Sequence, residues 1–267
     1  MFTFKLVRIR FFSPITFQSS HVEVPWRVPS DYLIRALTYA YSKMYDVSEW
    51  FSLLEQDIIR VSSLALVRKD KIYFPEYGQG YVSLDGEVID SSDLVIKAAR
   101  VRMPRIEGFE PTPFEDYQLL APRYDWAVIL GIRRDYYEEV FRKVLASLRF
   151  LGDVGIGARK ARGSGRFKVV NIDSPENYSA KIAASGPGKL ISRYVNSEGD
   201  LGKVKAFRIY RERTRVYYGD EIFKELEVAA EGSEIEVEDN GLLDYFVNDL
   251  MHRVPLYYRP LLIAASR

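Results

Sequence analysis

The sequence contains no cysteine and only two histidines, His21 and His252, among its 267 residues. The absence of cysteine excludes disulfide bridges, thiolate zinc sites, iron–sulfur clusters and cysteine nucleophiles. The two histidines lie far apart in the chain, which argues against a histidine-rich metal site. We therefore expect no metal and no other cofactor, and the cytoplasm is the expected compartment for a chain of this composition.

Long apolar runs are also absent. No run approaches the roughly 18 residues that a membrane-spanning helix needs. The N-terminal segment MFTFKLVRIRFF alternates apolar with basic residues, so we expect no signal peptide. The 47% hydrophobic and 28% charged residues are typical of a soluble globular protein with a real core. The length allows one large domain or two small ones.

The net charge of +1 conceals an uneven distribution of charged residues. Residues 149–168 contain six Lys or Arg and one acidic residue, whereas residues 220–249 contain eleven Asp or Glu and one Lys. The first stretch could face a polyanion, and the second would repel one. The alternative interpretation is that both stretches are ordinary solvated surfaces.

The first two thirds of the chain contain periodic segments that predict an alternation of strands and helices. The order is β-α-β-β-α-β, which is typical of a ferredoxin-like or RRM-like domain with helices on one sheet face and the other face free for a ligand. The first strand changes its apolar face midway, which predicts a bulge or a strand covered on both faces. The expected elements are a strand over 2–11, a loop over 13–29, a helix from Ser30, a hairpin of 58–67 with 71–75, an insertion over 76–124 that carries a protruding hairpin, a strand over 126–132, a helix capped by Asp135 and ended by Gly152, and a strand over 166–172.

The composition changes after residue 173. Residues 174–189 are rich in Ser, Gly, Pro and Asn, which predicts a linker. The remainder, residues 190–267, predicts a second, β-rich α+β unit. Its expected elements are strands over 190–195, 204–210, 213–218, 226–230 and 234–238, and a helix over 242–251.

A glycine-rich loop follows the second predicted helix of the first unit. Its sequence is GDVGIGARKARGSGR, and its glycines predict a backbone that adopts unusual φ/ψ values or approaches something closely. Exposed backbone N–H groups together with the cationic side chains would suit phosphate oxygens. It lacks the Lys and hydroxyl of a Walker A loop, and Lys160 occupies the third glycine position of a dinucleotide fingerprint. A flexible connector is the alternative. The candidate phosphate-binding residues are Gly155, Gly157, Arg159, Lys160, Arg162, Gly163, Gly165 and Arg166.

Two motifs resemble the RAMP proteins of CRISPR effector complexes. One is LGDVGIGARKARGSGRFKV at 151–169, and the other is FSPIT at 12–16 with VPSDYLIRAL at 28–37. Their pairing is similar to the family of the fourth subunit of the type III Csm complex. The resemblance covers most of residues 2–171. It implies a second, divergent ferredoxin-like domain in the remainder, so that the expected fold is α+β with two such domains.

The resemblance implies a role as well. A subunit of this family caps the 5′ repeat handle of the crRNA and docks the large polymerase-type subunit beside the backbone RAMP subunits. It is not an enzyme. The glycine loop would then clasp the handle, and the insertion would form a thumb-like hairpin. Arg100, Arg102 and Arg105 in that insertion could also contact RNA, or they could be solvated.

The alternative function is a metal-independent endoribonuclease of the same fold that processes precursor crRNA. His21 would then act as general acid or base, helped by Tyr32 or Lys43. Processing enzymes of this fold usually carry their glycine-rich loop near the C-terminus, whereas about 100 residues follow it here. We therefore expect His21 to bind RNA or to support the fold.

The acidic stretch 220–249 leads to a separate hypothesis. RNA would avoid it, so a basic protein surface, that of the large subunit, is the expected neighbour. Glu225, Glu227 and Glu231 are the residues whose charge reversal tests this hypothesis.

Overall fold

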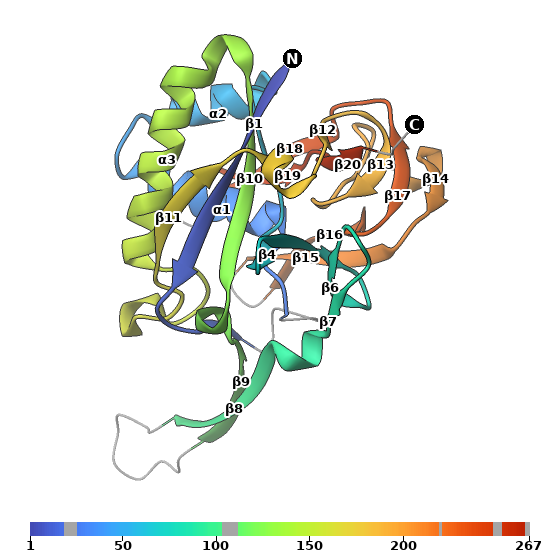
Figure 1. Cartoon of the computed structure of the whole chain (residues 1–267). Coiled ribbons are helices and arrows are strands. Elements are labelled where there is room, and N and C mark those ends of the chain that lie inside the picture. The colour runs from blue at the N-terminus through green and yellow to red at the C-terminus, as the bar shows by residue number, and fades with distance from the viewer. Residues whose placement is uncertain (19–25, 103–111, 219–220, 248–252, 265–267) are drawn as a thin grey trace.

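The protein is an α+β molecule in which most of the chain forms antiparallel sheets (Figure 1). The computed structural model describes residues 1–18, 26–102, 112–218, 221–247 and 253–264. These residues contain three α-helices, α1 (Ser30–Ser42), α2 (Val47–Glu55) and α3 (Tyr137–Val154). The predicted fold class, α+β, is confirmed.

The first half of the chain is built around an eight-stranded sheet in the order β11-β1-β10-β4-β5-β6-β7, with β3 also paired to β10. The predicted succession β-α-β-β-α-β is present as β1, α1, β3 with β4, β10, α3 and β11. The strands are β1 (Phe2–Phe11), β3 (Ile59–Val61), β4 (Ala65–Arg68), β5 (Lys71–Glu76), β6 (Gly80–Ser83), β7 (Val88–Ile89), β10 (Asp125–Arg133) and β11 (Phe167–Asp173).

The strand β1 is covered on both faces, as its change of apolar face predicts. Leu6 and Val7 are neighbours in sequence, they point to opposite faces, and both are fully buried. The pairing of β1 with β11 also shifts register between Arg8 and Ile9, which is the predicted irregularity. The strand β1 therefore has a neighbouring strand on each side, β11 and β10, and is covered on both faces.

The helices α1 and α3 pack against each other and against one face of this sheet. The apolar residues of α1 fall at helical spacing and form its inner face, because Leu33, Ile34, Leu37, Ala40 and Tyr41 are all buried. The helix α2 was not expected from the sequence. Its N-cap is Asp46, whose side chain accepts a hydrogen bond of 2.9 Å from the backbone N–H of Ser48.

The helix α1 begins at Ser30 as predicted, whereas the predicted ends of α3 are wrong. The Ser30 hydroxyl does not cap α1; it accepts a hydrogen bond from the backbone N–H of Arg193. Asp135 lies in a short 3-10 turn before α3, and the helix continues past Gly152 to Val154. Gly152 has a packing role instead, because a Cβ there would overlap the carbonyl oxygen of Phe167 on β11.

The expectation of a free sheet face is also wrong. Side chains of Leu6, Val67, Phe74 and Ile129 on that face form a buried cluster with residues from the second half of the chain, which are Ala180, Ile191 and Leu261. The two halves therefore share a core. A ligand has no open sheet surface to bind at this position.

The second half consists of a five-stranded sheet in the order β12-β20-β13-β17-β14 and of two ribbons, β15–β16 and β18–β19. A short 3-10 turn over Pro175–Tyr178, β12 and most of β13 lie within the range expected as a linker. The strands are β12 (Ile182–Ala183), β13 (Gly186–Leu190), β14 (Lys205–Arg208), β15 (Arg211–Tyr218), β16 (Glu221–Ala229), β17 (Glu234–Val237), β18 (Leu242–Val247), β19 (Arg253–Tyr258) and β20 (Leu262–Ala264).

Two predicted elements of this half are wrong. The segment expected as a helix over 242–251 contains the strand β18, which pairs along its whole length with β19. Its aromatic and β-branched residues Tyr245, Phe246 and Val247 favour such pairing over a helix. The strand expected over 190–195 ends at Leu190, and Tyr194 makes only an isolated bridge to Ala229.

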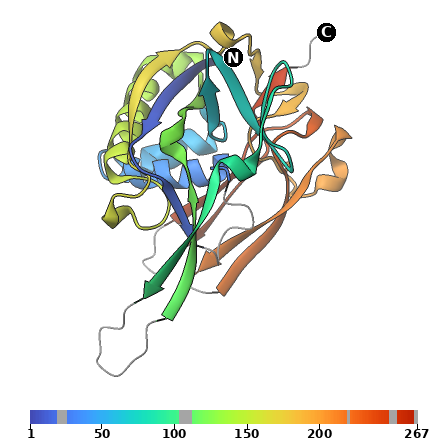
Figure 2. The same ribbon diagram turned by 60° about the horizontal axis from the view of Figure 1, so that its bottom comes forward.

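The predicted protruding hairpin is β8 (Val95–Arg102) with β9 (Thr112–Leu119). The segment expected as a loop over 13–29 contains a strand, β2 (Ile15–Gln18), which pairs with β9. Figures 1 and 2 both show β8 and β9 extending away from the body of the molecule. No α-helix in the described part of the chain combines the length and hydropathy that a membrane crossing requires.

Candidate nucleic-acid interface

The glycine-rich loop connects the end of α3 to the start of β11. Five of its residues have a positive φ, which L side chains rarely adopt. They are Gly155, Gly157, Arg159, Gly163 and Gly165. The glycine content of the sequence is thus explained at four positions by the backbone conformation.

The two limbs of the loop touch each other. The backbone N–H of Ile156 donates a hydrogen bond of 3.1 Å to the carbonyl oxygen of Gly165. A Cβ on Gly165 would overlap the carbonyl oxygen of Ile156, and one on Gly155 would overlap that of Ser164. Only glycine allows the limbs to approach so closely.

The loop is hydrogen-bonded to the segment that connects β1 to β2. We call residues 12–16, which include the first two residues of β2, the β1–β2 segment. The N–H of Gly165 donates to the carbonyl oxygen of Pro14 at 3.0 Å, and the N–H of Ala158 donates to that of Thr16 at 2.7 Å. The hydroxyl of Ser13 donates to the carbonyl oxygen of Gly163 at 2.6 Å and accepts from the N–H of Arg166 at 3.2 Å. The two sequence motifs that carry the family resemblance are therefore in contact.

Ser164 and Tyr32 complete this attachment. The hydroxyl of Ser164 donates to the carbonyl oxygen of Pro14 at 3.0 Å and accepts from the backbone N–H of Thr16 at the same distance. The phenol oxygen of Tyr32 on α1 accepts a hydrogen bond of 3.0 Å from the N–H of Gly157. Burial raises the pKa of Tyr32, which outweighs the opposite effects of this hydrogen bond and of Arg35. The phenol therefore stays neutral and positions the loop.

These contacts change the expected way of binding phosphate. The sequence predicts exposed backbone N–H groups, but nine of those in residues 155–166 donate hydrogen bonds within the protein. They belong to Gly155, Ile156, Gly157, Ala158, Arg162, Gly163, Ser164, Gly165 and Arg166. Phosphate binding by this loop therefore depends mainly on its cationic side chains.

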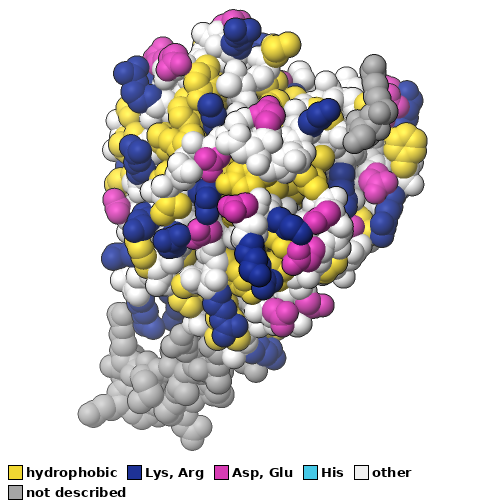
Figure 3. Space-filling view, in the orientation of Figure 1, with side chains coloured by type: hydrophobic (Ala, Val, Ile, Leu, Met, Phe, Trp, Pro, Cys, Tyr) yellow, Lys and Arg dark blue, Asp and Glu magenta, His cyan; other side chains and the backbone are white. Residues whose placement is uncertain are grey.

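Lys160, Arg162 and Arg166 are exposed, whereas Arg159 is half-buried. Arg159 and Arg162 border a hollow of about 250 Å³ between the loop, the β1–β2 segment and β9. Figure 3 shows Lys and Arg side chains spread over the visible face of the molecule, several of them at its lower end. We call this hollow, together with the exposed cations Lys160, Arg162 and Arg166, the loop face.

The other candidate RNA-binding residues are not part of the described loop face. Arg100 and Arg102 lie on β8, opposite Phe114 and Thr112 of β9. His21 and Arg105 lie outside the described residues. Their roles therefore stay predictions.

The acidic stretch is not a uniform exposed surface. Glu231 is fully buried, accepts a hydrogen bond from the Ser63 hydroxyl and forms an ion pair with Arg27. The expectation that Glu231 faces a partner subunit is therefore wrong. The register of β15 with β16 places Arg213 opposite Glu227 and Arg215 opposite Glu225, so the acidic strand runs beside a basic one.

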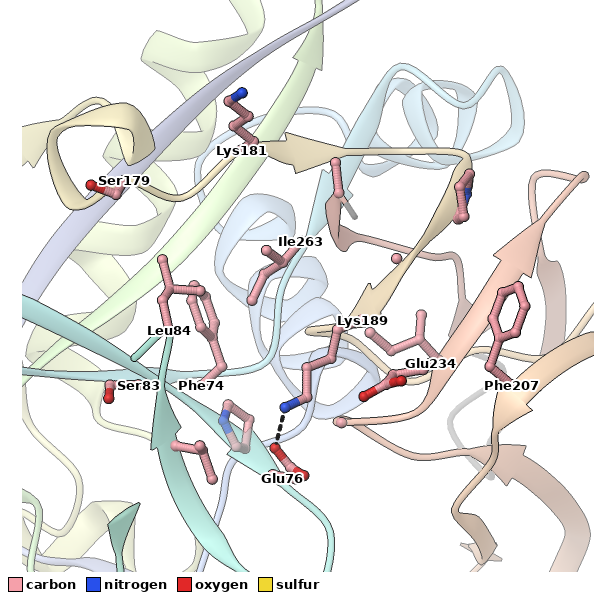
Figure 4. Close-up of a pocket in the computed structure, with 17 residues that line it drawn as sticks. Phe74, Glu76, Ser83, Leu84, Ser179, Lys181, Lys189, Phe207, Glu234 and Ile263 are labelled. Carbon is pink, nitrogen blue, oxygen red and sulfur yellow. Dashed lines mark hydrogen bonds and ion pairs between the residues drawn. The ribbon is translucent and has the colours of Figure 1, made fainter. Parts of the chain in front are cut away.

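A second hollow, of about 450 Å³, lies between the edge of the first sheet and the second sheet. Figure 4 shows Lys189 of β13 reaching across to an ion pair with Glu76 of β5, with Phe207 at the rim. The two charged groups at its centre thus neutralise each other. Among the described residues, no three His, Cys, Asp or Glu side chains converge on a possible metal position.

The loop face lies on a fold known from subunits of type III CRISPR–Cas complexes. One similar solved structure is a chain of the Csm3–Csm4 subcomplex in the type III-A interference complex, with 15% identity and a TM-score of 0.67 over 98% of this chain and 100% of that chain. Another is a chain of the Csm1–Csm4 cassette in complex with pppApA, with 15% identity and a TM-score of 0.59 over 99% of both chains. At this level of identity the similarity establishes a shared fold. No family model and no curated protein matches the chain.

Proposed function

We propose that this chain is a Csm4-like RAMP subunit of a type III CRISPR effector complex, which holds the 5′ handle of the crRNA. In that role it contacts the large subunit and the backbone RAMP subunits. It acts in the cytoplasm and carries out no catalytic step. The observation that carries the proposal is the glycine loop, which is fixed on the β1–β2 segment with its cations directed outward.

The arrangement of the first sheet supports this proposal. The strand order β11-β1-β10-β3, with α1 and α3 on one face, corresponds to a ferredoxin-like domain over residues 1–173. Residues 190–267 form a second, degenerate copy, whose sheet also takes in β12 and β13 from the segment 174–189. The match of almost the whole chain to chains of Csm4-containing complexes is consistent with both assignments.

The loop cations supply the electrostatic part of RNA binding. Exposed Lys and Arg side chains bind phosphate oxygens and release counterions, and each such contact contributes about 0.7 to the slope of log K against log salt on a single strand. The hydrogen bonds of the loop backbone fix the positions of the Cα atoms that carry these side chains. The side chains therefore present a defined surface to the handle. His21, Arg100, Arg102 and Arg105 extend the proposed surface.

The test compares two triple variants. The loop variant carries Lys160→Glu, Arg162→Glu and Arg166→Glu, and the control carries Arg134→Glu, Arg142→Glu and Lys181→Glu, which are exposed at other places. Binding of a crRNA with its 5′ handle is measured by fluorescence anisotropy between 50 and 300 mM salt, about the range in which such slopes are resolved. We expect the loop variant to bind more weakly, with a slope reduced by about 2.

The same mixtures distinguish the two functions. We expect wild-type protein to leave the RNA intact in Mg²⁺ and in EDTA. A single defined cut in EDTA would support the precursor-processing endoribonuclease instead. A salt slope that is the same in wild type and loop variant would remove the loop from the binding site.

A further inference from the structure

Two exposed aromatic rings flank the glycine loop. Phe12 follows β1 directly and is 62% exposed, and Tyr39 on α1 is 44% exposed. The backbone N–H of Phe12 donates a hydrogen bond of 2.8 Å to the carbonyl oxygen of Arg166 at the end of the loop. Phe12 is therefore tied to one border of the loop face.

Tyr39 lies at the other border. It is seven residues beyond Tyr32, the residue that accepts the hydrogen bond from Gly157. Seven residues make nearly two helical turns, so both side chains leave the same face of α1, about 10 Å apart along the helix axis. The loop thus runs between a ring from the β1–β2 segment and a ring from α1.

Both rings are accompanied by lysines. The Nζ of Lys168 lies 5.7 Å from the centroid of the Phe12 ring. The Nζ atoms of Lys160 and Lys43 lie 5.2 and 5.4 Å from the centroid of the Tyr39 ring. A lysine over an exposed ring is held less strongly than a stacked nucleobase, so a base can displace it. The displaced ammonium then remains beside the ring, within reach of a phosphate of the same strand.

This combination fits single-stranded RNA better than a protein surface. Unpaired bases stack on exposed aromatic rings, and the adjacent phosphates need cations. An apolar protein surface that covered the rings would also desolvate the lysines, and each buried cation would then require an acidic partner. The rings and lysines together therefore have the chemistry of a nucleotide site.

We propose that Phe12 and Tyr39 are stacking platforms for two unpaired bases of the RNA, one on each side of the glycine loop. The inference rests on the proposed function, because it requires that RNA lies on the loop face. It adds two residues that contact the bases rather than the phosphates. Phe12 begins the motif FSPIT, but the sequence does not distinguish the exposed rings of Phe12 and Tyr39 from the many buried ones.

The test uses Phe12→Ala and Tyr39→Ala with two matched controls, Phe207→Ala and Tyr136→Ala. Phe207 is 78% exposed on β14, and Tyr136 is 45% exposed at the opposite end of α3. We expect each platform variant to raise the Kd for a crRNA with its 5′ handle by about 5- to 150-fold, the range measured for lost base stacking. The salt slope should stay unchanged, because no phosphate contact is removed. Both controls should bind like wild type.

A second measurement identifies the stacked bases. Handle nucleotides are replaced one at a time by abasic nucleotides, and wild type should lose affinity at two of the positions. In Phe12→Ala the loss at one of these positions should disappear, and in Tyr39→Ala the loss at the other. Tyr39→Phe and Phe12→Trp keep a ring and should keep the affinity.

The outcomes separate this inference from the proposed function. If the triple loop variant lowers the salt slope while both alanine variants bind as tightly as wild type, the platforms are refuted and the RNA-binding role stands. If the alanine variants lose a partner subunit on purification but bind RNA normally, the rings are protein contacts and the inference is wrong. If the triple variant has no effect, the proposed function itself fails.

Discussion

Two glycines of the loop, only two positions apart, are required for different reasons. Gly163 and Gly165 both have a positive φ, of 82° and 68°. A Cβ on Gly163 would meet nothing within 4 Å, whereas one on Gly165 would overlap the carbonyl oxygen of Ile156. Gly163 is therefore required only by its backbone conformation. Gly165 is required by its backbone conformation and also by the close contact between the two limbs.

This difference predicts unequal effects of alanine. Gly163→Ala should destabilise the protein by about 1 kcal/mol, the cost of a left-handed conformation for an L residue. Gly165→Ala adds the overlap and should cost about 3 kcal/mol or more. Urea denaturation followed by circular dichroism measures both values. Equal losses of stability in the two variants would mean that the limbs of the loop do not touch in solution.

At the scale of elements, strong local periodicity made some of the structure predictable. The buried face of α1 and the body of α3 follow from apolar spacing alone. The helix α2 is short, and its local signals are limited to the acidic cap at residue 46 with Glu49 three residues later, and one apolar group at helical spacing, Trp50, Leu53 and Leu54. The strand β18 resembles a helix because Leu242, Leu243 and Phe246 fall at helical spacing, while the strand that pairs with it lies further along the chain.

The central strands β1 and β10 are joined by an ion pair that titrates. Asp125 of β10 accepts hydrogen bonds from Arg10 at 2.7 Å and from Arg8 at 3.0 Å. The hydrogen bond from Arg10 is the main reason that the pKa of Asp125 lies below its usual value, and desolvation acts in the opposite direction. Because the pKa is lower in the folded state, the stabilisation is present above about pH 4 and is lost as the pH falls through the folded pKa.

Asp125→Asn tests this link between the two strands. At pH 7 we expect a loss of about 1 kcal/mol in the free energy of unfolding, a modest value because the Arg10 side chain is half-exposed. Between about pH 4 and pH 2 the difference from wild type should shrink towards zero. A difference that is constant from pH 7 to pH 2 would show that the carboxylate charge does not contribute. Thermal unfolding of wild type and Asp125→Asn over this pH range, without denaturant, gives the two free energies of unfolding.

At the scale of the whole molecule, buried charges join the two halves. Arg27 forms ion pairs with Glu212 and Glu231, and Arg193 pairs with Asp31 and Glu212. Burial raises the pKa of Glu212, while the two arginines act in the opposite direction. The partners Arg27 and Glu212 are 185 residues apart in the chain. No local pattern could reveal this network, and for the same reason the sequence made Glu231 look like an exposed residue of an acidic stretch.

Glu231→Ala and Glu227→Ala form a matched pair for this network. Glu231 is fully buried, while the Glu227 side chain is 46% exposed. Removing Glu231 leaves Arg27 without one of its two buried partners, so we expect a loss of about 3 kcal/mol. Glu227→Ala should change the free energy of unfolding by less than about 0.5 kcal/mol. If thermal and urea unfolding give similar values for both variants, the buried network does not hold the two halves together.

The attachment of the glycine loop to α1 and the β1–β2 segment also determines the entropy of binding. Fixing the backbone of one flexible residue costs about 1–2 kcal/mol at 25 °C. Here the loop backbone already makes its hydrogen bonds within the protein, so most of that loss falls on folding rather than on association. On the proposed function, an arriving RNA strand needs to order only the outer side chains. Diffusion and electrostatic steering then set the rate of encounter, and no slow rearrangement of the protein is required.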